Sequence, residues 1–328
     1  MMSSFLKGKT IMVTGGTGSF GQAFTEILLR EHDPYSVRIY SRGELNQMLM
    51  AERFSDEEHL RFFIGDVRDS QRLQRAMNGV DFVVHAAALK QVPACEYNPI
   101  EAVRTNIDGT VNIIDTAIDN GVEKVMVIST DKAVHPVNLY GATKMVAEKL
   151  AIQGNSYSGE RRTRFSCVRY GNVLGSRGSV IPLFLAQKES GEITITDERM
   201  TRFWLTVQQG AQFVIDCLEM MAGGEVFVPR IPSMRVTDLA EAIAPEARRR
   251  VIGIRPGEKL HEILLTEDEA RHAKALPDRF IIEPEHTFWK KADSSNGDYL
   301  PEGFRYSSDT NDHWLSIEDI RRMLGNSG

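Results

Sequence analysis

The chain has 328 residues, of which 42% are hydrophobic, and a formal net charge of -6. This length can bury a large core in one α/β domain, or in a domain with a smaller lobe, and the charge offers no basic field for nucleic acid. No apolar run approaches the ~20 residues that a membrane span needs. The first residues lack the apolar stretch of a signal peptide, and the three cysteines form no Cys-x-x-Cys pair. A cytoplasmic protein is therefore expected.

Apolar runs alternate with amphipathic stretches through the first half of the chain, a pattern typical of a parallel sheet covered by helices. Buried strands are predicted at Thr10–Thr14, Val37–Tyr40, Leu60–Ile64, Asp81–His85, Lys124–Ile128 and Phe165–Tyr170. Helices are predicted at Gln22–Glu31 and Pro99–Asn120. The fold class is therefore α/β, with a Rossmann-type doubly wound parallel sheet in residues 1–175.

The alternation weakens after about residue 175, where short strands mix with short helices. The strands are expected at Ile193–Ile195 and Glu225–Val228, and the helices at Val207–Met221, Val236–Ile243 and Ile317–Leu324. We expect residues 176–328 to form mainly a smaller C-terminal α/β lobe that binds the substrate, with segments able to return to the first domain.

A glycine-rich loop follows the first strand and opens the first helix, in the sequence Thr14-Gly15-Gly16-Thr17-Gly18-Ser19-Phe20-Gly21. Glycines allow the tight turn and let the backbone approach a pyrophosphate at the helix N-terminus. The alternative is an ordinary strand–helix turn. Between a strand and a helix, the loop predicts a dinucleotide site formed by Gly15, Thr17, Gly18, Ser19, Phe20 and Gly21.

The end of the second strand bears on the choice between NAD and NADP. An NAD site usually carries Asp or Glu there for the ribose hydroxyls, whereas this strand continues Ser41-Arg42. Arg42 can pair with a 2'-phosphate and Ser41 can donate to one, which favours NADP. Two alternatives stay open. Glu44 would be an NAD-type acid if the register differed by two residues, and Arg42 could form only a surface salt bridge.

The ends of the third and fourth strands offer further cofactor contacts. Asp66 could accept a hydrogen bond from the adenine amino group. Small residues after the fourth strand would let the sheet edge lie against the cofactor. The candidates are Asp66, Val67, Ala86, Ala87 and Ala88.

Tyr140 and Lys144 lie one helical turn apart, on one face of a predicted helix. A free tyrosine has a pKa of about 10. A nearby ammonium and a nicotinamide cation favour the phenolate, so the pair can take a proton from an alcohol while a hydride leaves its carbon. Lys144 could also bond the nicotinamide ribose. The alternative is a helix surface that happens to carry an aromatic residue and a lysine.

The glycine loop, the Ser129-Thr130 strand end and Tyr140-x-x-x-Lys144 resemble the extended short-chain dehydrogenase/reductase superfamily. Within it, the sequence is similar to the configuration-inverting UDP-N-acetylglucosamine 4,6-dehydratases, which start the bacterial pathway to pseudaminic acid, a sugar of flagellin glycosylation. The stretches that carry the narrower resemblance are Phe62–Asp69, His85–Pro93, Arg169–Val173, Gly175–Pro182, Met200–Trp204 and Ile252–Glu262. This resemblance implies a lyase with recycled NADP, which Tyr170 and Val173 also contact.

The same resemblance gives meaning to Asp131-Lys132, which follows Thr130. Retaining dehydratases usually place Asp-Glu there, and an amine in the second position marks the inverting family. The expected reaction oxidises sugar C4, removes water across C5 and C6, and returns hydride to C6. The roles implied are Tyr140 as base for the C4 hydroxyl, Lys132 as base at C5 with a depressed pKa, and Asp131 as acid for the leaving water. Tyr140 or a water could reprotonate C5. Asp131-Lys132 could instead be a surface ion pair.

The family resemblance also implies a sugar-nucleotide site between the lobes, with UDP-N-acetylglucosamine as substrate. Arg202 and Arg255 suit a diphosphate, and Glu258 suits ribose hydroxyls. The full set of candidates is Lys90, Asn172, Val180, Pro182, Thr194, Thr196, Arg202, Arg255 and Glu258. Each of these could also be a merely solvated loop residue.

Several readings compete with the inverting dehydratase. They are a retaining 4,6-dehydratase or a C4 epimerase of UDP-sugars for capsule or O-antigen, and a non-catalytic NADP-binding regulator. Asp131-Lys132 argues against the epimerase, and the intact Tyr140 and Lys144 argue against the regulator. His261-Glu262 lacks the second histidine of a zinc motif, so no metal is expected. The superfamily often pairs through its Tyr-Lys helix, which suggests a dimer or a hexamer.

Overall fold

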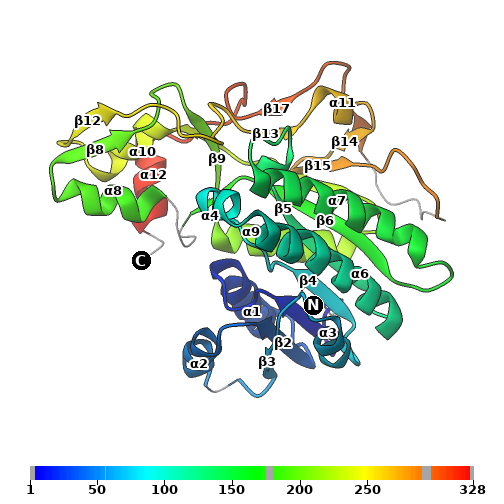
Figure 1. Cartoon of the computed structure of the whole chain (residues 1–328). Helices are drawn as coiled ribbons and strands as arrows, with labels where there is room; N and C mark the ends of the chain where they lie inside the picture. The colour runs from blue at the N-terminus through cyan, green and yellow to red at the C-terminus, as the bar shows by residue number, and fades with distance from the viewer. Residues whose placement is uncertain (1–3, 56, 175–179, 290–296, 326–328) are drawn as a thin grey trace.

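A ten-stranded sheet forms the centre of the computed structural model, which describes residues 4–55, 57–174, 180–289 and 297–325 (Figure 1). Its strand order is β16-β14-β15-β10-β6-β5-β4-β1-β2-β3. The parallel strands are β1 (Thr10–Thr14), β2 (Ser36–Ser41), β3 (Leu60–Ile64), β4 (Phe82–His85), β5 (Lys124–Thr130), β6 (Arg164–Tyr170) and β10 (Val226–Pro229). The order 3-2-1-4-5-6 confirms the predicted Rossmann-type doubly wound sheet.

The parallel strands are near-continuous apolar runs because helices cover both faces of the sheet. Along β1 every residue is buried. The helices packed around the sheet are α1 (Ser19–Glu31), α2 (Glu44–Arg53), α3 (Ser70–Met77), α6 (Gly109–Asn120), α7 (Leu139–Tyr157) and α9 (Val207–Met220). Helix α9 packs against α1, while α6 packs between α3 and α7. Among the described residues, no helix combines the length and apolar character that a bilayer crossing demands.

The predicted helix Pro99–Asn120 is present as three consecutive pieces. These are α5 (Pro99–Val103), a π-helical turn η1 (Arg104–Asp108) and α6, and the short helix α4 (Val92–Tyr97) precedes them. Buried Asn106 lies in the π-turn, where its side chain bonds both the N–H and the carbonyl of Leu89 and the hydroxyl of Thr143. Such π-turns often occur at functional sites, and this one ties the segment after β4 to α7.

The sheet continues beyond β10 with antiparallel strands from the C-terminal half of the chain. They are β15 (Arg279–Ile282), β14 (Ala273–Ala275) and β16 (Asp298–Tyr299), and the short helix α11 (Glu267–Ala270) precedes them. The division predicted at residues 175 and 176 falls at 175–179, outside the described residues.

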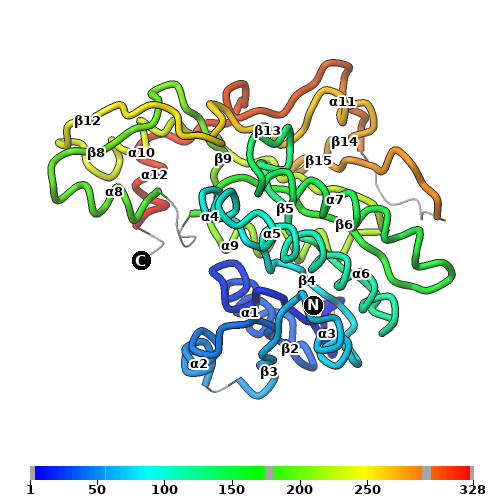
Figure 2. The backbone as a smooth tube through the Cα atoms, viewed as in Figure 1, coloured from blue at the N-terminus to red at the C-terminus, as the bar shows by residue number. Residues whose placement is uncertain are grey.

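A second, smaller lobe has its own hydrophobic core. It contains α8 (Val180–Lys188), α10 (Val236–Ile243) and α12 (Ile317–Gly325), with the parallel pair β8 (Glu192–Ile195) and β12 (Arg248–Val251). Figure 2 shows the chain passing back and forth between this lobe and the large sheet. Ile320 on α12 is buried in the same core as Ile193 on β8, so both ends of this half of the chain hold the lobe together.

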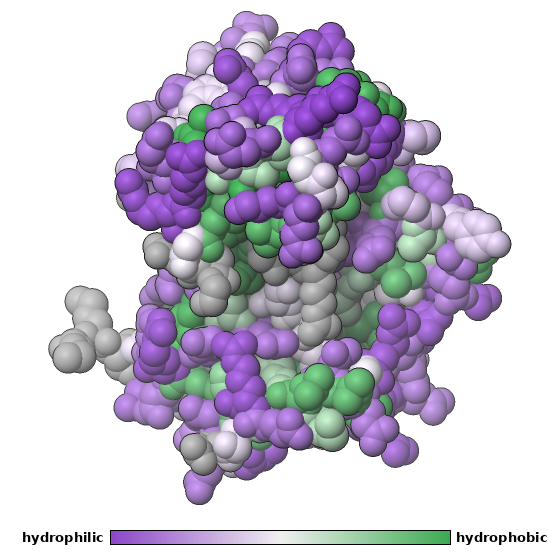
Figure 3. All heavy atoms as spheres, turned by 90° about the vertical axis from the view of Figure 1, so that its left-hand side faces the viewer, coloured by the Kyte–Doolittle hydropathy of each residue, from purple (hydrophilic) through white to green (hydrophobic). Residues whose placement is uncertain are grey.

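A small sheet lies between the two cores. Its strands are β7 (Asn172–Leu174), β9 (Thr201–Thr206) and β11 (Ser233–Arg235), and the pair β13 (Ile263–Leu265) and β17 (Tyr306–Ser307) lies nearby. Because side chains alternate along a strand, Phe203 and Leu205 of β9 enter the large core, whereas Trp204 enters the small one. The face that carries the small lobe is hollowed between an upper and a lower mass (Figure 3).

Candidate active site

A cavity of about 510 Å³ opens at the carboxyl ends of the parallel strands. Open α/β sheets bind their ligands in this crevice. The predicted cofactor and catalytic residues all line it: Gly15, Thr17, Gly18, Ser19, Phe20, Gly21, Ser41, Arg42, Asp66, Val67, Ala86, Ala87, Ala88, Thr130, Asp131, Lys132, Tyr140, Lys144, Tyr170 and Val173. The folded chain therefore brings residues spread over 159 positions of sequence to one crevice.

The glycine loop is packed too closely for side chains. Gly15 has φ 67°, and a Cβ there would lie 2.9 Å from the backbone of Ala87. A Cβ on Gly21 would overlap the backbone of Gly16. Gly18 caps α1 and offers no side chain to the first N–H groups of the helix. Those N–H groups remain available to an anion, so the loop fits the pyrophosphate of a dinucleotide.

Arg42 lies at the adenosine end expected for this cavity, half exposed and 3.7 Å from Asp66. Partial burial opposes ionisation of Asp66, but hydrogen bonds from Arg68 hold its pKa below the ordinary value. Glu44, the alternative acid, is exposed at the start of α2 and is not among the residues that line the cavity. Of these two charged side chains after β2, Arg42 is thus the one that lines the cavity.

Tyr140 and Lys144 project from the first turns of α7, which begins after Asn138. The Asn138 side chain accepts a hydrogen bond of 2.7 Å from the N–H of Gly141 and so caps the helix. Burial raises the pKa of Tyr140 to about 12, although Lys132 and Thr130 lower it. Burial also lowers the pKa of Lys144. In this structure Tyr140 is therefore a phenol at neutral pH, whereas the sequence favoured the phenolate.

Asp131 and Lys132 lie in η2 (Asp131–Ala133), a 3-10 turn directly after β5. Asp131 is 1% exposed, and its Oδ1 accepts hydrogen bonds from the Thr130 hydroxyl at 2.9 Å and from Lys132 Nζ at 3.0 Å. A Cβ on Gly141 would overlap the carbonyl oxygen of Lys132. The glycine after Tyr140 therefore lets α7 approach η2 closely, which brings the tyrosine beside the ion pair.

The protonation state of Lys132 differs from the expected one. Burial lowers its pKa, but the carboxylates of Asp131 and Glu262 outweigh burial and raise that pKa above the ordinary value. Lys132 is therefore an ammonium at neutral pH, and the depressed pKa expected from the sequence is not found. Burial dominates when a lysine has no anionic partner, and here two carboxylates lie within 3.5 Å of Nζ.

A second cavity of about 430 Å³ adjoins the first, and Lys132, Asn172 and Val173 line both. Of the predicted substrate residues, Val180, Thr194, Thr196, Arg202, Arg255 and Glu258 line the second cavity and Lys90 lines the first. Pro182 is exposed on α8 and lines neither. Residues 175–179, also part of the resemblance, lie outside the described residues.

Some of these side chains are already engaged by the protein. The Arg202 guanidinium donates to the carbonyls of Thr201, Lys259 and Leu260, and the Thr194 hydroxyl accepts from Gln187 at 2.8 Å. In contrast, the buried Oδ1 of Asn172 has no hydrogen-bond partner within the described ranges. An unmet buried acceptor at the junction of two cavities is suited to a ligand donor.

Sequence analysis missed part of the site. Glu262, Lys259, Met200 and Asn138 also line the second cavity. Glu262 was considered as part of the stretch that carries the family resemblance and of a zinc motif, but not as a site residue. In the part of the chain that the structure describes, no group of His, Cys, Asp or Glu is arranged to hold a metal ion. The signal in the sequence that could have found Glu262 was the run Glu258-Lys259-Leu260-His261-Glu262, in which acidic and basic side chains lie close together.

The sequence comparisons agree with this architecture. Residues 11–284 match the family described as polysaccharide biosynthesis protein. The chain is 48% identical over 329 residues to the UDP-N-acetylglucosamine 4,6-dehydratase (inverting) of Campylobacter jejuni strain 81-176, covering 98% of each chain. It is 40% identical over 331 residues to the UDP-glucose 4-epimerase of Rickettsia canadensis, covering 96% of this chain and 95% of the relative.

Solved structures give the same picture. Pen from Bacillus thuringiensis superposes with a TM-score of 0.90 at 41% identity, covering 98% of both chains. DesIV, a dTDP-glucose 4,6-dehydratase from Streptomyces venezuelae solved with NAD and TYD bound, has a TM-score of 0.68 at 23% identity and covers 76% of this chain and 86% of its own. That second likeness is one of fold.

The fold and the crevice define a Rossmann-type protein of the short-chain dehydrogenase/reductase kind. The chain belongs to the polysaccharide biosynthesis protein family, within which its resemblance to the inverting UDP-N-acetylglucosamine 4,6-dehydratases is confirmed.

Proposed function

We propose that the protein is a UDP-N-acetylglucosamine 4,6-dehydratase that inverts C5. Its product would be UDP-2-acetamido-2,6-dideoxy-beta-L-arabino-hex-4-ulose, the first intermediate on the route to pseudaminic acid. The observation that carries this proposal is the 48% identity, over almost the whole of both chains, to an inverting enzyme of that substrate. The net reaction is a loss of water, which makes the protein a hydro-lyase.

A nicotinamide cofactor fits the first cavity, where the glycine loop and the α1 N-terminus would hold its pyrophosphate. Bound there, it would take a hydride from the sugar and give it back, so it is recycled. Tyr140 would first lose its own proton, which the bound nicotinamide cation favours, and the phenolate would then receive the proton of the C4 hydroxyl, while Lys144 would hold the ribose. Arg42 supports NADP as the form used.

The Asp131–Lys132 ion pair supplies the acid and base that elimination needs. Moving one proton along the 3.0 Å hydrogen bond from Lys132 Nζ to Asp131 Oδ1 gives a neutral amine and a carboxylic acid. The amine then takes the C5 proton, and the acid gives its proton to the departing C6 hydroxyl, forming water. This step restores the ion pair without proton loss to solvent. The raised pKa of Lys132 opposes this transfer, so the neutral pair is the minor form, and elimination draws on it as it forms.

The second cavity would hold the UDP part of the substrate, with the sugar reaching Lys132. Arg255 is half exposed and 3.9 Å from Glu258, so both can turn toward a diphosphate and a ribose. Asn172, with its unmet acceptor at the junction, would receive a donor from the sugar nucleotide.

Self-association through α7 accompanies this proposal. Tyr97 on α4, Ile100 on α5, and Met145 and Val146 on α7 are exposed apolar residues on helices that pack together. A dimer or a hexamer would cover them. Sedimentation of the protein as a monomer at micromolar concentration would contradict this prediction.

Proton NMR of the protein with UDP-N-acetylglucosamine in heavy water, with catalytic NADP and no reductant, tests the function. We expect a 6-deoxy-4-keto product of L-arabino configuration with deuterium at C5. The D-xylo isomer alone would indicate a retaining dehydratase. Unchanged substrate would reject the proposal for this sugar.

Replacing Arg42 with alanine is expected to weaken NADP binding by about tenfold or more and to leave NAD binding nearly unchanged. The reason is the loss of a charge-assisted bond to the 2'-phosphate, which contributes about 1.5–3 kcal/mol. Titration calorimetry with both dinucleotides measures the ratio.

The matched variant Glu44→Gln decides between the two interpretations of this strand end. Glu44 does not line the cavity, so its removal is expected to leave both affinities unchanged. A selective loss of NAD affinity in Glu44→Gln would instead support the alternative register.

A C4 epimerase is the second candidate function, because the chain is also 40% identical to UDP-glucose 4-epimerases. An epimerase needs Tyr140 and the cofactor but no acid for a leaving hydroxyl. UDP-N-acetylgalactosamine as the sole product in the NMR experiment would favour this candidate.

A further inference from the structure

Glu262 is a buried carboxylate that lies between the two cavities. It is 2% exposed and directly precedes β13. Its backbone N–H donates to the Ser308 hydroxyl at 2.9 Å, and its carbonyl accepts from the Ser308 N–H at 2.8 Å. This backbone clamp fixes the position from which the side chain reaches the site.

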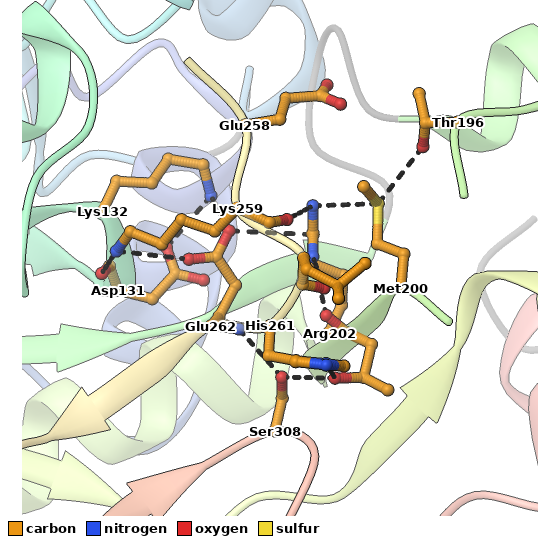
Figure 4. A network of polar contacts seen from close by, with 12 residues as sticks. Asp131, Lys132, Thr196, Met200, Arg202, Glu258, Lys259, His261, Glu262 and Ser308 are labelled. Carbon is orange, nitrogen blue, oxygen red and sulfur yellow. Dashed lines mark hydrogen bonds and ion pairs between the residues drawn. The ribbon is translucent and has the colours of Figure 1, made fainter. Parts of the chain in front are cut away.

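Three cations surround the Glu262 side chain (Figure 4). Oε1 lies 3.5 Å from Lys132 Nζ and 3.7 Å from Arg202 Nε, and Oε2 lies 3.7 Å from Lys259 Nζ. Within the described ranges, Oε2 has no hydrogen-bond partner. Burying an unpaired charge is costly, and the three cations around this buried carboxylate offset that cost.

Two of these cations, Lys259 and Arg202, donate hydrogen bonds to backbone carbonyls and not to Glu262. Lys259 donates to the backbone carbonyls of Asp131 and Val134, and Arg202 donates to three backbone carbonyls. Lys132 donates to the side chain of Asp131 and is the one of these three cations that lines both cavities. Glu262 therefore acts on the site chiefly through Lys132.

Lys132 is held between two carboxylates from distant parts of the chain. Asp131 of η2 lies at 3.0 Å and Glu262 at 3.5 Å. The other charged or titratable groups that act on it are Lys90 after β4, Tyr140 on α7, Arg202 on β9 and Lys259. The two carboxylates prevail over burial and over the neighbouring cations, and they raise the pKa of Lys132.

We propose that Glu262 is a positioning residue that sets the stereochemical outcome, because it keeps the abstracted proton on Lys132 from returning to the face of C5 that it left. This inference rests on the proposed function and concerns the fate of one proton within it.

The chemistry of inversion requires such a device. When the C5–H bond breaks, its proton forms a new N–H bond on Lys132, and the electron pair of the C–H bond expels the C6 oxygen, which leaves as water with the proton of Asp131. C5 must later receive a proton on its opposite face. Lys132 still lies beside the first face and would restore the original configuration if it donated. The neighbouring Glu262 carboxylate makes the Lys132 ammonium a weaker proton donor. C5 is therefore protonated mainly by the donor on its opposite face.

The test is the initial ratio of the two C5 isomers made by Glu262→Gln, read by NMR and extrapolated to zero conversion. Glutamine keeps the shape but removes the charge, so Lys132 becomes a stronger acid and a better proton donor to C5. We expect the fraction of retained D-xylo isomer to rise about tenfold over wild type. An unchanged isomer ratio in a variant that still dehydrates would overturn the inference.

Two further variants complete the experiment. Glu225→Gln is the matched control, because Glu225 is also 2% exposed but accepts from Ser166 at 2.6 Å in the β6–β10 region. It should keep the wild-type ratio, and an equal rise there would show a general effect of losing a buried carboxylate. Glu262→Asp keeps the charge but retracts it. If Glu262→Gln does not fold, the retained fraction of Glu262→Asp must exceed that of wild type, and equality overturns the inference.

The product made by the wild-type protein distinguishes failure of the proposed function from failure of the role proposed for Glu262. If wild type makes no dehydrated product, the proposed function fails. If wild type makes the L-arabino isomer while the Glu262 variants make the same ratio, only the role of Glu262 fails.

Discussion

Replacing Lys132 with methionine is expected to lower kcat for the loss of water by about 10²–10⁴-fold, the usual contribution of a positioned acid or base. Methionine keeps much of the stem that packs in η2 and removes the amine that lines both cavities. The same change removes the proton that Asp131 needs, because Lys132 Nζ is its 3.0 Å donor. The rate of product formation by NMR gives kcat, and titration with NADP gives the cofactor affinity.

Lys149→Met is the matched control, since Lys149 is exposed on α7 away from the cavities. It should keep the wild-type rate. We also expect Lys132→Met to bind NADP with wild-type affinity, because the glycine loop is untouched. Full turnover by Lys132→Met would reject the assigned role, and a parallel loss of NADP binding would point to a folding defect instead.

Replacing Arg169 with methionine is expected to cost about 3–5 kcal/mol of the free energy of unfolding, as removal of one partner of a buried ion pair does. Arg169 on β6 bonds both oxygens of Glu148 on α7, at 3.1 and 2.7 Å, and both oxygens of Glu269 on α11. It also donates to the Leu264 carbonyl at 2.9 Å. The substitution leaves two carboxylates without their cation. Urea unfolding followed by circular dichroism measures the change.

The exposed Arg162, in the loop before β6, provides the control for loss of an arginine. Arg162→Met should change stability by no more than about 0.5 kcal/mol. Adding Glu148→Gln to Arg169→Met should recover part of the loss, because one stranded charge disappears. A loss below about 1 kcal/mol for Arg169→Met would mean that solvent reaches the network and screens it.

The parallel strands could be predicted closely because burial on both faces leaves a plain apolar run. Thr10–Thr14 and Leu60–Ile64 have the predicted bounds. The prediction of one helix at Pro99–Asn120 was less accurate, because this segment contains a π-turn in its middle and no local sequence preference marks that turn. That turn depends on Asn106 finding partners in another segment.

The crevice could be predicted from motifs, because strand ends of one parallel sheet meet at one edge. The protonation state of Lys132 in this crevice could not be predicted from motifs. Burial and the adjacent Asp131 affect the pKa of Lys132 most, but that pKa also depends on Glu262, 130 positions later in the chain, and on the clamp at Ser308 that holds Glu262. The local sequence around Asp131-Lys132 does not indicate that Glu262 lies beside Lys132.

The route of the chain between the lobes has a consequence for biosynthesis. The Rossmann sheet gains β10 from residue 226 onward and β15, β14 and β16 only from residues 273–299, while the small lobe closes with α12 at residue 317. A nascent chain that ends after β6 would therefore expose an unpaired strand edge to other chains. Most of the residue pairs that lie in contact in the folded protein are far apart in sequence. Such long-range contacts slow folding. We expect neither lobe to fold while the ribosome still holds the last hundred residues, so the enzyme assembles late and as one unit.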